Sequence, residues 1–308
     1  MAATTAAPAR PRRRAGGRRA RQALVAWGFA LPFFVLFVVF MAGPVLASLA
    51  MSFTDMRSTD LRHPFAVNVV GLGNYARLLG DEVFRQAALN TAYFVVVAIP
   101  LTIVLALVVA VGLNSGITRL RTVFRLGYYL PVVTSIVAVA VVWRFLLQPD
   151  SGPLNQVLGW FGIQGPDWLN SSAWAMPALI LMTAWRNLGS LMVIFLAGLQ
   201  AIPPELYEAA ELDGAGMWQR FSRITVPLLR PALLFGAVIT GIGYLQFFEE
   251  PFVMTQGGPL NHTLSVAYDI FNQFGFGNYG YAAAMGYVLF VVIVAMTVLQ
   301  FRLLRPTT

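Results

Sequence analysis

The stretch AALNTAYFVVVAIPLTIVLALVVAVGL, residues 87–113, decides the fold because it contains no charged side chain. An α-helix needs about 20 apolar residues to cross the hydrocarbon core of a bilayer. Residues 87–113 exceed that length. They therefore predict a membrane-spanning helix.

Five further stretches, 17 to 29 residues long, are also predominantly apolar. In chain order they are Ala23–Met51, Leu126–Leu147, Ala173–Leu199, Ala232–Phe248 and Tyr281–Leu303. The whole chain of 308 residues is 58% hydrophobic and only 11% charged, whereas soluble domains carry about 25% charged residues. The sequence thus predicts an all-α, polytopic membrane protein with six transmembrane helices.

Arginine-rich residues precede the first stretch, as they do in a secretory signal peptide. The uncharged run from Gln22 to Thr54 is much longer than the hydrophobic region of a signal, about 7–15 residues. We therefore expect a retained first span.

The composition excludes several classes of function. The chain has no cysteine, so a disulfide framework, a thiolate nucleophile and a cysteine metal site are ruled out. Its two histidines, His63 and His262, make a histidine-rich metal site unexpected. The pattern GxxxxGK[ST] is missing from the sequence, so the chain does not bind ATP through a P-loop. We predict no cofactor, no metal and no enzymatic activity.

The basic residues are all arginines, and seven of the 21 fall within the first 21 residues. The remaining 14 arginines nearly balance the 13 acidic residues. The positive charge is therefore a property of a tail rather than of a face that could bind nucleic acid. We expect residues 1–22 to form a disordered cytoplasmic tail close to anionic membrane lipid.

The distribution of arginine between the loops predicts the orientation, because cytoplasmic loops are enriched in positive charge. With the N-terminus inside, the cytoplasmic segments hold fifteen arginines and the outer loops hold four, all of them in the first outer loop: Arg57, Arg62, Arg77 and Arg85. Both termini are then cytoplasmic, and we expect residues 23–305 to form a single membrane domain. The polar segment between the fourth and fifth spans, residues 203–231, is cytoplasmic as well.

This polar segment has the pattern of two short helices. Pro204 suits the first turn of a helix, and Gly214 can adopt the left-handed conformation that ends one. A second helix is expected from Gly216 to about Thr225, ended by Pro227 and Pro231 before the fifth span. From the residues alone, the pair is equally compatible with a docking surface for another protein and with a hairpin lying on lipid headgroups.

The segment also resembles the EAA loop of binding-protein-dependent ABC importer permeases. The residues EAA at 208–210 are followed by a glycine four positions later and by Ile-x-x-Pro ten positions after that glycine. In that family the loop is a coupling helix that docks into a separate ATPase subunit. The resemblance implies that coupling involves Glu208, Ala209, Ala210, Asp213, Gly214, Ile224 and Pro227.

Other stretches are similar to the carbohydrate-uptake branch of that family, which includes the maltose and glycerol-phosphate permeases. They are GLGNYARLL, RTVFRLGYYLP, FLAGLQAIP and MTQGGP. The resemblance implies a six-span permease of the bacterial cytoplasmic membrane that imports a carbohydrate or related polar solute. It further implies a second, related but different permease chain, two ATP-hydrolysing subunits and an extracytoplasmic solute-binding protein.

Two charges lie deep within predicted spans. Arg186 is about 15 residues from the cytoplasmic end of the fourth span, roughly 20 Å at 1.5 Å per residue, and Glu249 lies at a similar depth. A charge at that depth usually faces a cavity or a partner. We predict an Arg186–Glu249 pair or a shared polar cavity, with Glu250 as a substitute; a purely structural ion pair is the alternative.

Neighbouring residues complete a candidate solute path. Asn187 and Ser190 accompany Arg186, and Tyr244 and Phe247 are expected on one helix face at i and i+3. Aromatic faces and hydrogen-bonding side chains together suit a sugar. By spacing, substrate-lining positions of the maltose permease correspond to Arg186, Asn187, Ser190, Tyr244 and Phe247. Gln246 and Glu249 match the family's usual Gln-x-Phe-Asp pattern, with Glu in place of Asp. The predicted path is Arg186, Asn187, Ser190, Tyr244, Gln246, Phe247 and Glu249.

Two other classes of function stay open. An ion-coupled secondary transporter of a polar solute would be marked by an inverted repeat and broken helices around the site. A membrane-embedded enzyme or scaffold would need a catalytic cluster that the sequence does not suggest.

Overall fold

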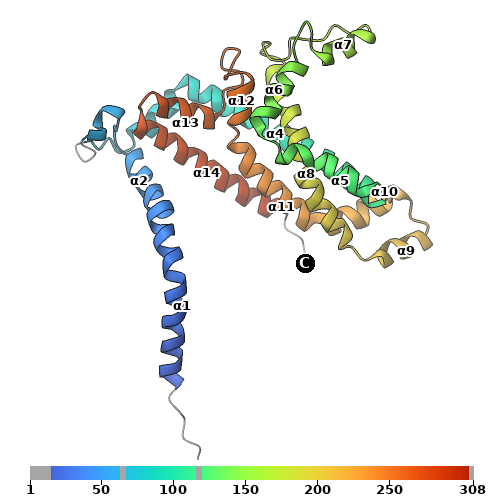
Figure 1. Cartoon of the computed structure of the whole chain (residues 1–308), viewed down its shortest axis with the longest axis horizontal. Helices are drawn as coiled ribbons and strands as arrows, with labels where there is room; N and C mark the ends of the chain where they lie inside the picture. Colours follow the sequence, from blue (N-terminus) through green and yellow to red (C-terminus); the bar gives the residue numbers. More distant parts are fainter. Residues whose placement is uncertain (1–14, 63–66, 116–119, 305–308) are drawn as a thin grey trace, which may run out of the picture. The chain divides into compact units, whose positions relative to one another are not determined.

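The computed structural model describes residues 15–62, 67–115 and 120–304. Most of the predicted tail, residues 1–14, lies outside the described residues. The chain divides into two compact units, residues 1–51 and residues 52–308. Figure 1 shows that helices dominate both units.

The first unit is one long apolar helix with a π-helical turn inside it. Helix α1 (Ala15–Phe37) leads through the π-helical segment Val38–Ala42 into α2 (Gly43–Ser52). The N–H of Gly43 bonds to the carbonyl of Val38, five residues back. Proline lacks an N–H and crowds the carbonyl four residues before it. The wider turn therefore lets Pro44 follow without ending the helix.

The second unit contains the remaining helices of the described residues. After a 3₁₀ turn at Ser58–Arg62, its helices are α3 (Gly73–Gly80), α4 (Glu82–Ser115), α5 (Arg121–Val133), α6 (Ile136–Leu146), α7 (Pro153–Trp160), α8 (Ala175–Gln200), α9 (Pro204–Leu212), α10 (Met217–Arg220), α11 (Val226–Leu245), α12 (Glu249–Met254), α13 (Val266–Gly275) and α14 (Tyr279–Leu304).

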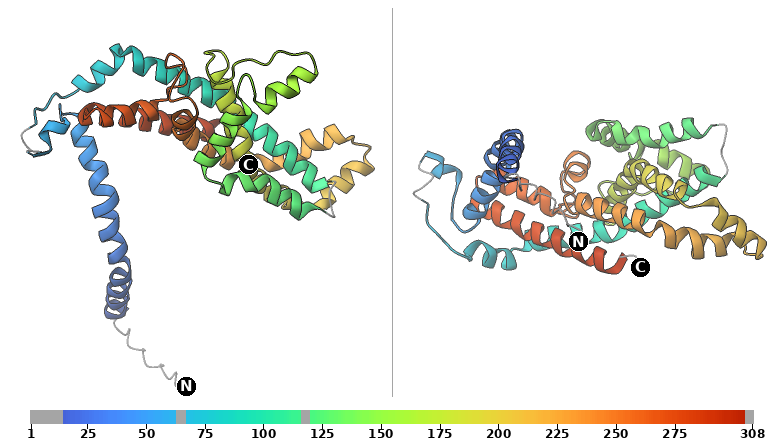
Figure 2. Two further views of the ribbon diagram at one scale, coloured as in Figure 1. Left: turned by 45° about the horizontal axis from the view of Figure 1, so that its top comes forward. Right: turned by 90° about the horizontal axis from the view of Figure 1, so that it is seen from below.

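The core of this unit is built on α4 and α8. These two helices make the most extensive contact, and α11 packs against both of them and against α14. The views in Figures 1 and 2 agree that α11 runs beside α14. Phe94, Met182 and Phe195 are completely buried. Small residues permit the closest approach, because a Cβ added at Gly189 of α8 would lie 2.2 Å from the carbonyl oxygen of Tyr128 in α5.

The third predicted span is broken rather than continuous. Helices α5 and α6 meet at an angle of 100°, with Thr134 extended at ψ 144° between them. The hydroxyl of Thr134 donates to the carbonyl of Leu130 at 2.8 Å, the acceptor that the Thr134 N–H would use in a helix. Pro131 also removes a donor from this turn. Apolarity predicted the span, but these local bonds end its first helix.

The region around the fifth span differs from expectation at both ends. Pro227 and Pro231 do not end the second helix of the polar segment, because α10 passes through a π-helical turn, Phe221–Thr225, directly into α11. As in the first unit, the π-turn stands two residues before a proline. At the other end α11 stops at Leu245, so Tyr244 and Phe247 do not share a helix face.

The prediction of an all-helical polytopic membrane protein is confirmed. Within the described residues, five helices are long and apolar enough to cross a membrane, and the bent pair α5–α6 makes a sixth crossing if it counts as one span.

Candidate functional site

All seven residues of the predicted solute path line one cavity of about 480 Å³ in the second unit. Helix α8 supplies Arg186, Asn187 and Ser190, while α11 and the segment after it supply Tyr244, Gln246, Phe247 and Glu249. Residues distant in sequence thus meet because α8 packs against α11. Ile136 of α6 also reaches the cavity.

Polar groups on α8 face this cavity with part of their hydrogen-bonding capacity free. The Nε atom of Arg186 is buried and lacks a hydrogen-bond partner among the described residues. Asn187 donates from Nδ2 to the hydroxyl of Tyr244 at 3.4 Å. An unpaired buried donor is costly, so a solute that accepts a hydrogen bond from Arg186 would remove that cost.

The two adjacent glutamates after α11 have different environments. Glu249 is exposed and Glu250 is only 6% exposed, and both line the cavity. They form the first turn of α12, where the helix dipole stabilises negative charge. Among the described residues, ion pairs within 4.0 Å are Arg85–Glu82 and Arg220–Glu211. Arg186 and the glutamates therefore share the cavity without forming such a pair.

Tyr244 and Phe247 form the aromatic wall of the cavity. They contact residues of α4 that were not predicted from the sequence to belong to the site. Tyr244 and Phe247 are 5% and 4% exposed. The ring of Phe94 from α4 stacks on Phe247 with centroids 3.9 Å apart and meets Tyr244 edge-on. Thr102, also from α4, hydrogen-bonds to the Tyr244 hydroxyl at 2.9 Å. A threonine inside an apolar span is the one signal that could have pointed to α4.

The cavity therefore combines charged groups, amides and hydroxyls with a buried aromatic wall. Gln246 donates from Nε2 to the carbonyl of Ile242, which leaves its own carbonyl oxygen as an acceptor. Donors and acceptors of this kind, beside an apolar ring face, can satisfy the hydroxyls of a polyhydroxylated solute. The cavity volume also falls within the range for small-molecule sites, about 300–1,000 Å³.

The predicted coupling residues lie on and around a sharply turned helix pair. Helix α9 ends in a Schellman motif, with Gly214 at φ +76°. The N–H of Ala215 bonds to the carbonyl of Ala210 at 2.8 Å, and the N–H of Gly214 bonds to the carbonyl of Glu211 at 3.0 Å. A residue with a Cβ is disfavoured at such a φ, which accounts for glycine at position 214.

Two side-chain contacts hold the helix pair in this shape. Arg220 reaches Glu211 at 2.8 Å, and the hydroxyls of Tyr207 and Thr225 lie 2.9 Å apart. The remaining predicted residues are positioned by these helices. Glu208, Ala209, Asp213 and Gly214 are exposed, whereas Ala210, Ile224 and Pro227 are half-buried.

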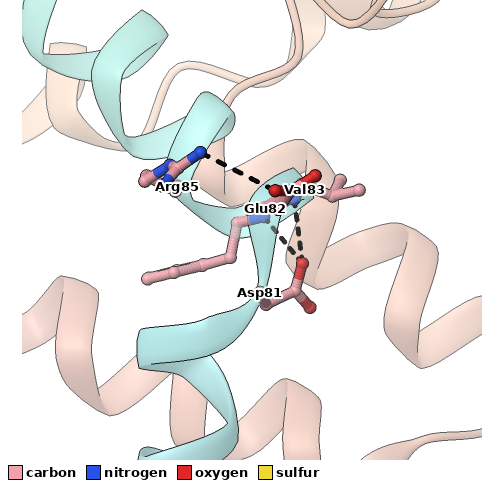
Figure 3. A network of polar contacts seen from close by, with 5 residues as sticks. Asp81, Glu82, Val83 and Arg85 are labelled. Atoms are coloured by element: carbon pink, nitrogen blue, oxygen red, sulfur yellow. Dashed lines mark hydrogen bonds and ion pairs between the residues drawn. The ribbon is translucent and has the colours of Figure 1, made fainter.

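A second polar network lies where α3 meets α4. At the start of α4, Asp81 accepts hydrogen bonds from the N–H groups of Val83 at 2.9 Å and Phe84 at 3.1 Å. Figure 3 shows the carboxyl of Asp81 turned toward the first residues of α4. Burial opposes the charged form, but the hydrogen bonds from the Tyr281 hydroxyl and from these N–H groups hold the pKa of Asp81 below its ordinary value. Asp81 is thereby fixed as an anion and a helix cap.

The neighbouring carboxyl of Asp269 on α13 behaves in the opposite way. It is 2% exposed, and its Oδ2 atom lacks a hydrogen-bond partner among the described residues. Burial, reinforced by the negative charge of Asp81, raises the pKa of Asp269 to about 6.

Comparisons with known proteins agree with this geometry. Residues 84–307 match the model of the family "Binding-protein-dependent transport system inner membrane component". The lactose transport system permease protein LacF of Rhizobium radiobacter is 38% identical over 285 residues, covering 91% of this chain and 93% of that protein. The arabinooligosaccharides transport system permease protein AraP of Bacillus subtilis (strain 168) is 32% identical over 278 residues, covering 89% and 87%.

Solved structures show the same fold. A chain of a bacterial ABC transporter involved in the import of the acidic polysaccharide alginate superposes with a TM-score of 0.75 at 25% identity. The match covers 95% of this chain and 99% of that chain.

An all-helical membrane protein with a polar cavity between its spans and a turned helix pair in a polar loop has the architecture of a transport permease. More specifically, the chain belongs to the family of binding-protein-dependent transport system inner membrane components, in its carbohydrate-uptake branch. It is thus the permease component of an ABC importer and not itself catalytic.

Proposed function

We propose that this chain imports a neutral disaccharide or short oligosaccharide through the cavity between α8 and α11. The observation that carries the proposal is the convergence of seven predicted residues on that one cavity. Relatives named for lactose and for arabinooligosaccharides support this class of solute. Opposite charges on Arg186 and the exposed Glu249 favour a neutral solute that offers both donors and acceptors over a strongly charged one.

In this proposal the solute makes two kinds of contact. Arg186, Asn187 and Ser190 hydrogen-bond its hydroxyls from α8, and Gln246 and Glu249 do so from the segment after α11. The aromatic wall formed by Tyr244 and Phe247 packs against its C–H face. Because each group is positioned in advance, little conformational entropy is lost when the solute binds.

Energy reaches the cavity through the coupling loop, residues 203–231, of a permease domain that spans residues 23–305. The exposed Glu208, Ala209 and Asp213 dock onto an ATPase subunit, and Gly214 gives the loop the turn that this docking needs. Half-buried Ala210, Ile224 and Pro227 link the loop to α11. Closure of two ATPases then moves the loop and changes which side of the membrane the cavity faces.

The assembly in this proposal has four kinds of partner. A second, related but different permease chain completes the pore, and two ATP-hydrolysing subunits bind on the cytoplasmic side. An extracytoplasmic solute-binding protein delivers the solute, and membrane lipid surrounds the spans and attracts the arginine-rich tail. Both termini are then cytoplasmic in the bacterial inner membrane, as the arginine distribution predicts.

The test is ATP-driven uptake by the whole transporter in proteoliposomes, with lactose, maltose, trehalose and arabinotriose as probes. We expect Arg186→Leu to reduce the uptake of whichever sugars the wild type carries by about tenfold or more, because a charged hydrogen bond contributes about 1.5–3 kcal/mol. Binding of the ATPase subunits should not change. Arg144→Leu is the matched control, because Arg144 is exposed and lies outside the cavity.

Two results would contradict the proposal. One is unchanged sugar uptake and affinity in Arg186→Leu. The other is uptake by this chain alone, driven by a proton gradient without ATPase subunits, which would make it a secondary transporter.

A further inference from the structure

Helix α4 presents three residues along one face toward the aromatic wall of the cavity. Phe94, Ala98 and Thr102 are spaced at i, i+4 and i+8, and all three are completely buried. Neither Phe94 nor Thr102 lines the cavity. Both instead contact residues that do line it, Tyr244 and Phe247.

The hydrogen bonds at this face run in one direction. Thr102 donates its only hydroxyl proton to the carbonyl of Ala98 at 2.6 Å. The bond between Thr102 and Tyr244, 2.9 Å long, must therefore be donated by the Tyr244 hydroxyl. The Tyr244 oxygen is then left to accept from Asn187, whose Nδ2 lies 3.4 Å away. This fixes the donor direction from Asn187 through Tyr244 to Thr102.

The ring contacts fix the other half of the wall. Phe94 and Phe247 stack with an angle of 6° between their planes, and Phe94 meets Tyr244 at 61° with centroids 5.4 Å apart. One ring of α4 therefore touches both wall residues. In addition, the Ser265 hydroxyl donates to the backbone carbonyl of Phe247 at 2.7 Å, which holds the main chain of the wall in place.

We infer that Phe94 and Thr102 are positioning residues that set the orientation of Tyr244 and Phe247, and thereby the shape of the cavity that receives the solute. This inference rests on the proposed function of the cavity. A residue that only filled the core could exchange its hydroxyl for a methyl group with little effect. Here that exchange leaves the buried Tyr244 hydroxyl without an acceptor, which is costly enough to move the ring.

The experiment uses the absence of cysteine from the chain. Gly243 lines the cavity, and a Cβ added there meets no atom within 4 Å, so Gly243→Cys gives a single thiol inside the cavity. In the assembled transporter in membranes, its rate of reaction with a cationic methanethiosulfonate is measured. We expect Thr102→Val and Phe94→Leu to raise that rate by about threefold or more, because the wall is released.

Two comparisons separate positioning from a general loss of packing. Thr102→Ser keeps the hydroxyl and should retain the parental rate. Phe195→Leu removes an equally buried ring outside the cavity and should not change the rate. Unchanged rates in both Thr102→Val and Phe94→Leu would overturn the inference, and so would an equal increase in Thr102→Ser or Phe195→Leu.

The labelling readout does not depend on transport. If Arg186→Leu lowers sugar uptake while Thr102→Val leaves labelling unchanged, the positioning role fails and the proposed function stands. If labelling responds as expected but Arg186→Leu transports normally, positioning of the wall is supported while the assignment of the cavity to solute fails.

Discussion

Large apolar side chains are exposed in the coupling loop but buried in the wall of the cavity. In the loop, Leu212, Met217 and Trp218 are 90%, 82% and 74% exposed. In the wall, Tyr244 and Phe247 are 5% and 4% exposed. Large exposed apolar side chains gathered on one surface mark a contact with another molecule. The exposed side chains agree with the proposed docking of the loop onto a protein partner, whereas the residues that support the wall belong to the chain itself.

The contacts that stabilise the two regions also differ in how deeply they are buried. The loop is held by a backbone motif around Gly214, by an ion pair at its surface and by one bond between the Tyr207 and Thr225 hydroxyls. The wall is held by stacked rings and by buried hydroxyl bonds from α4. Surface ion pairs contribute little to stability, whereas buried polar contacts are costly to disrupt. Substitutions in the two regions should therefore have different consequences.

Of the substitutions considered, we expect Gly214→Val in the coupling loop to reduce transport most. The φ of +76° at Gly214 costs a β-branched residue about 1–2 kcal/mol or more, so Gly214→Val should reshape the loop without disturbing the buried wall. We expect ATP-driven sugar uptake to fall by at least about tenfold and the ATPase subunits to be lost when the permease is purified. Thermal stability of the permease itself should change little.

Gly216→Ala is the control for that substitution. Gly216 has φ −68°, and a Cβ added there meets nothing within 4 Å. Normal ATPase binding by Gly214→Val would show that the turn is unnecessary for coupling and would break the contrast between the two regions.

Outside the loop, we expect the greatest loss of stability from a substitution at Gly189, where α8 packs against α5. A Cβ at this position would meet three backbone atoms of Tyr128 and Tyr129 within 2.9 Å, and backbone cannot rotate away as a side chain can. We expect Gly189→Ala to lower the free energy of unfolding by about 3 kcal/mol, seen as a lower melting temperature in detergent.

Gly112→Ala provides the matched control for that measurement. Gly112 is also helical, in α4, but a Cβ there meets nothing within 4 Å. Because alanine favours helices by about 1 kcal/mol over glycine, this control should be neutral or stabilising. An equal melting temperature for Gly189→Ala and wild type would show that α5 and α8 do not meet closely in solution.

The coupling loop and the cavity also differ in how they could be predicted from the sequence. The coupling loop could be predicted because its signal is local: EAA, Gly214 and Pro227 stand at fixed spacings within one loop. The six apolar stretches likewise predicted the spans, since the need for about 20 apolar residues acts on each segment separately. The seven cavity residues were predicted because charge within a span, or family spacing, drew attention to them.

What could not be predicted depends on contacts between distant segments. Phe94 looks like any core phenylalanine until α4 packs against α11, and nothing local distinguishes buried Glu250 from exposed Glu249. The break at Thr134 and the π-turn before Pro227 were missed for a different reason. The π-turn is a small change in hydrogen-bond register, and the break at Thr134 is a 100° bend at an extended residue. Neither alters the apolarity from which the spans were predicted.

A buried and an exposed carboxyl should differ in how much they affect stability. Asp269 is the buried one. Its pKa of about 6 lies above the ordinary 3.8, so the folded state binds more protons between these values. The free energy of unfolding should therefore fall as pH rises from about 4 to about 6, and the cost should persist at higher pH. Asp269→Asn removes this ionisation, and we expect it to gain roughly 1–3 kcal/mol over wild type at about pH 7.5.

Melting temperatures from about pH 4 to pH 7.5 test this expectation. The gain should vanish at the acid end of the range, where the carboxyl is neutral in both states. Asp150→Asn, at an exposed position, should show no such trend. A constant difference between Asp269→Asn and wild type at every pH would mean that the carboxyl does not titrate in this window.

The smallest expected effect concerns the exposed carboxyl, Glu211. Its oxygen lies 2.8 Å from Arg220, but the Glu211 side chain is 70% exposed and that of Arg220 is 27% exposed. Water competes with such a pair, so a double-mutant cycle with Glu211→Gln and Arg220→Gln should give a coupling free energy below about 1 kcal/mol. That value should shrink further in high salt. A coupling above about 2 kcal/mol would mean that the ion pair, and not the backbone motif at Gly214, holds the loop in shape.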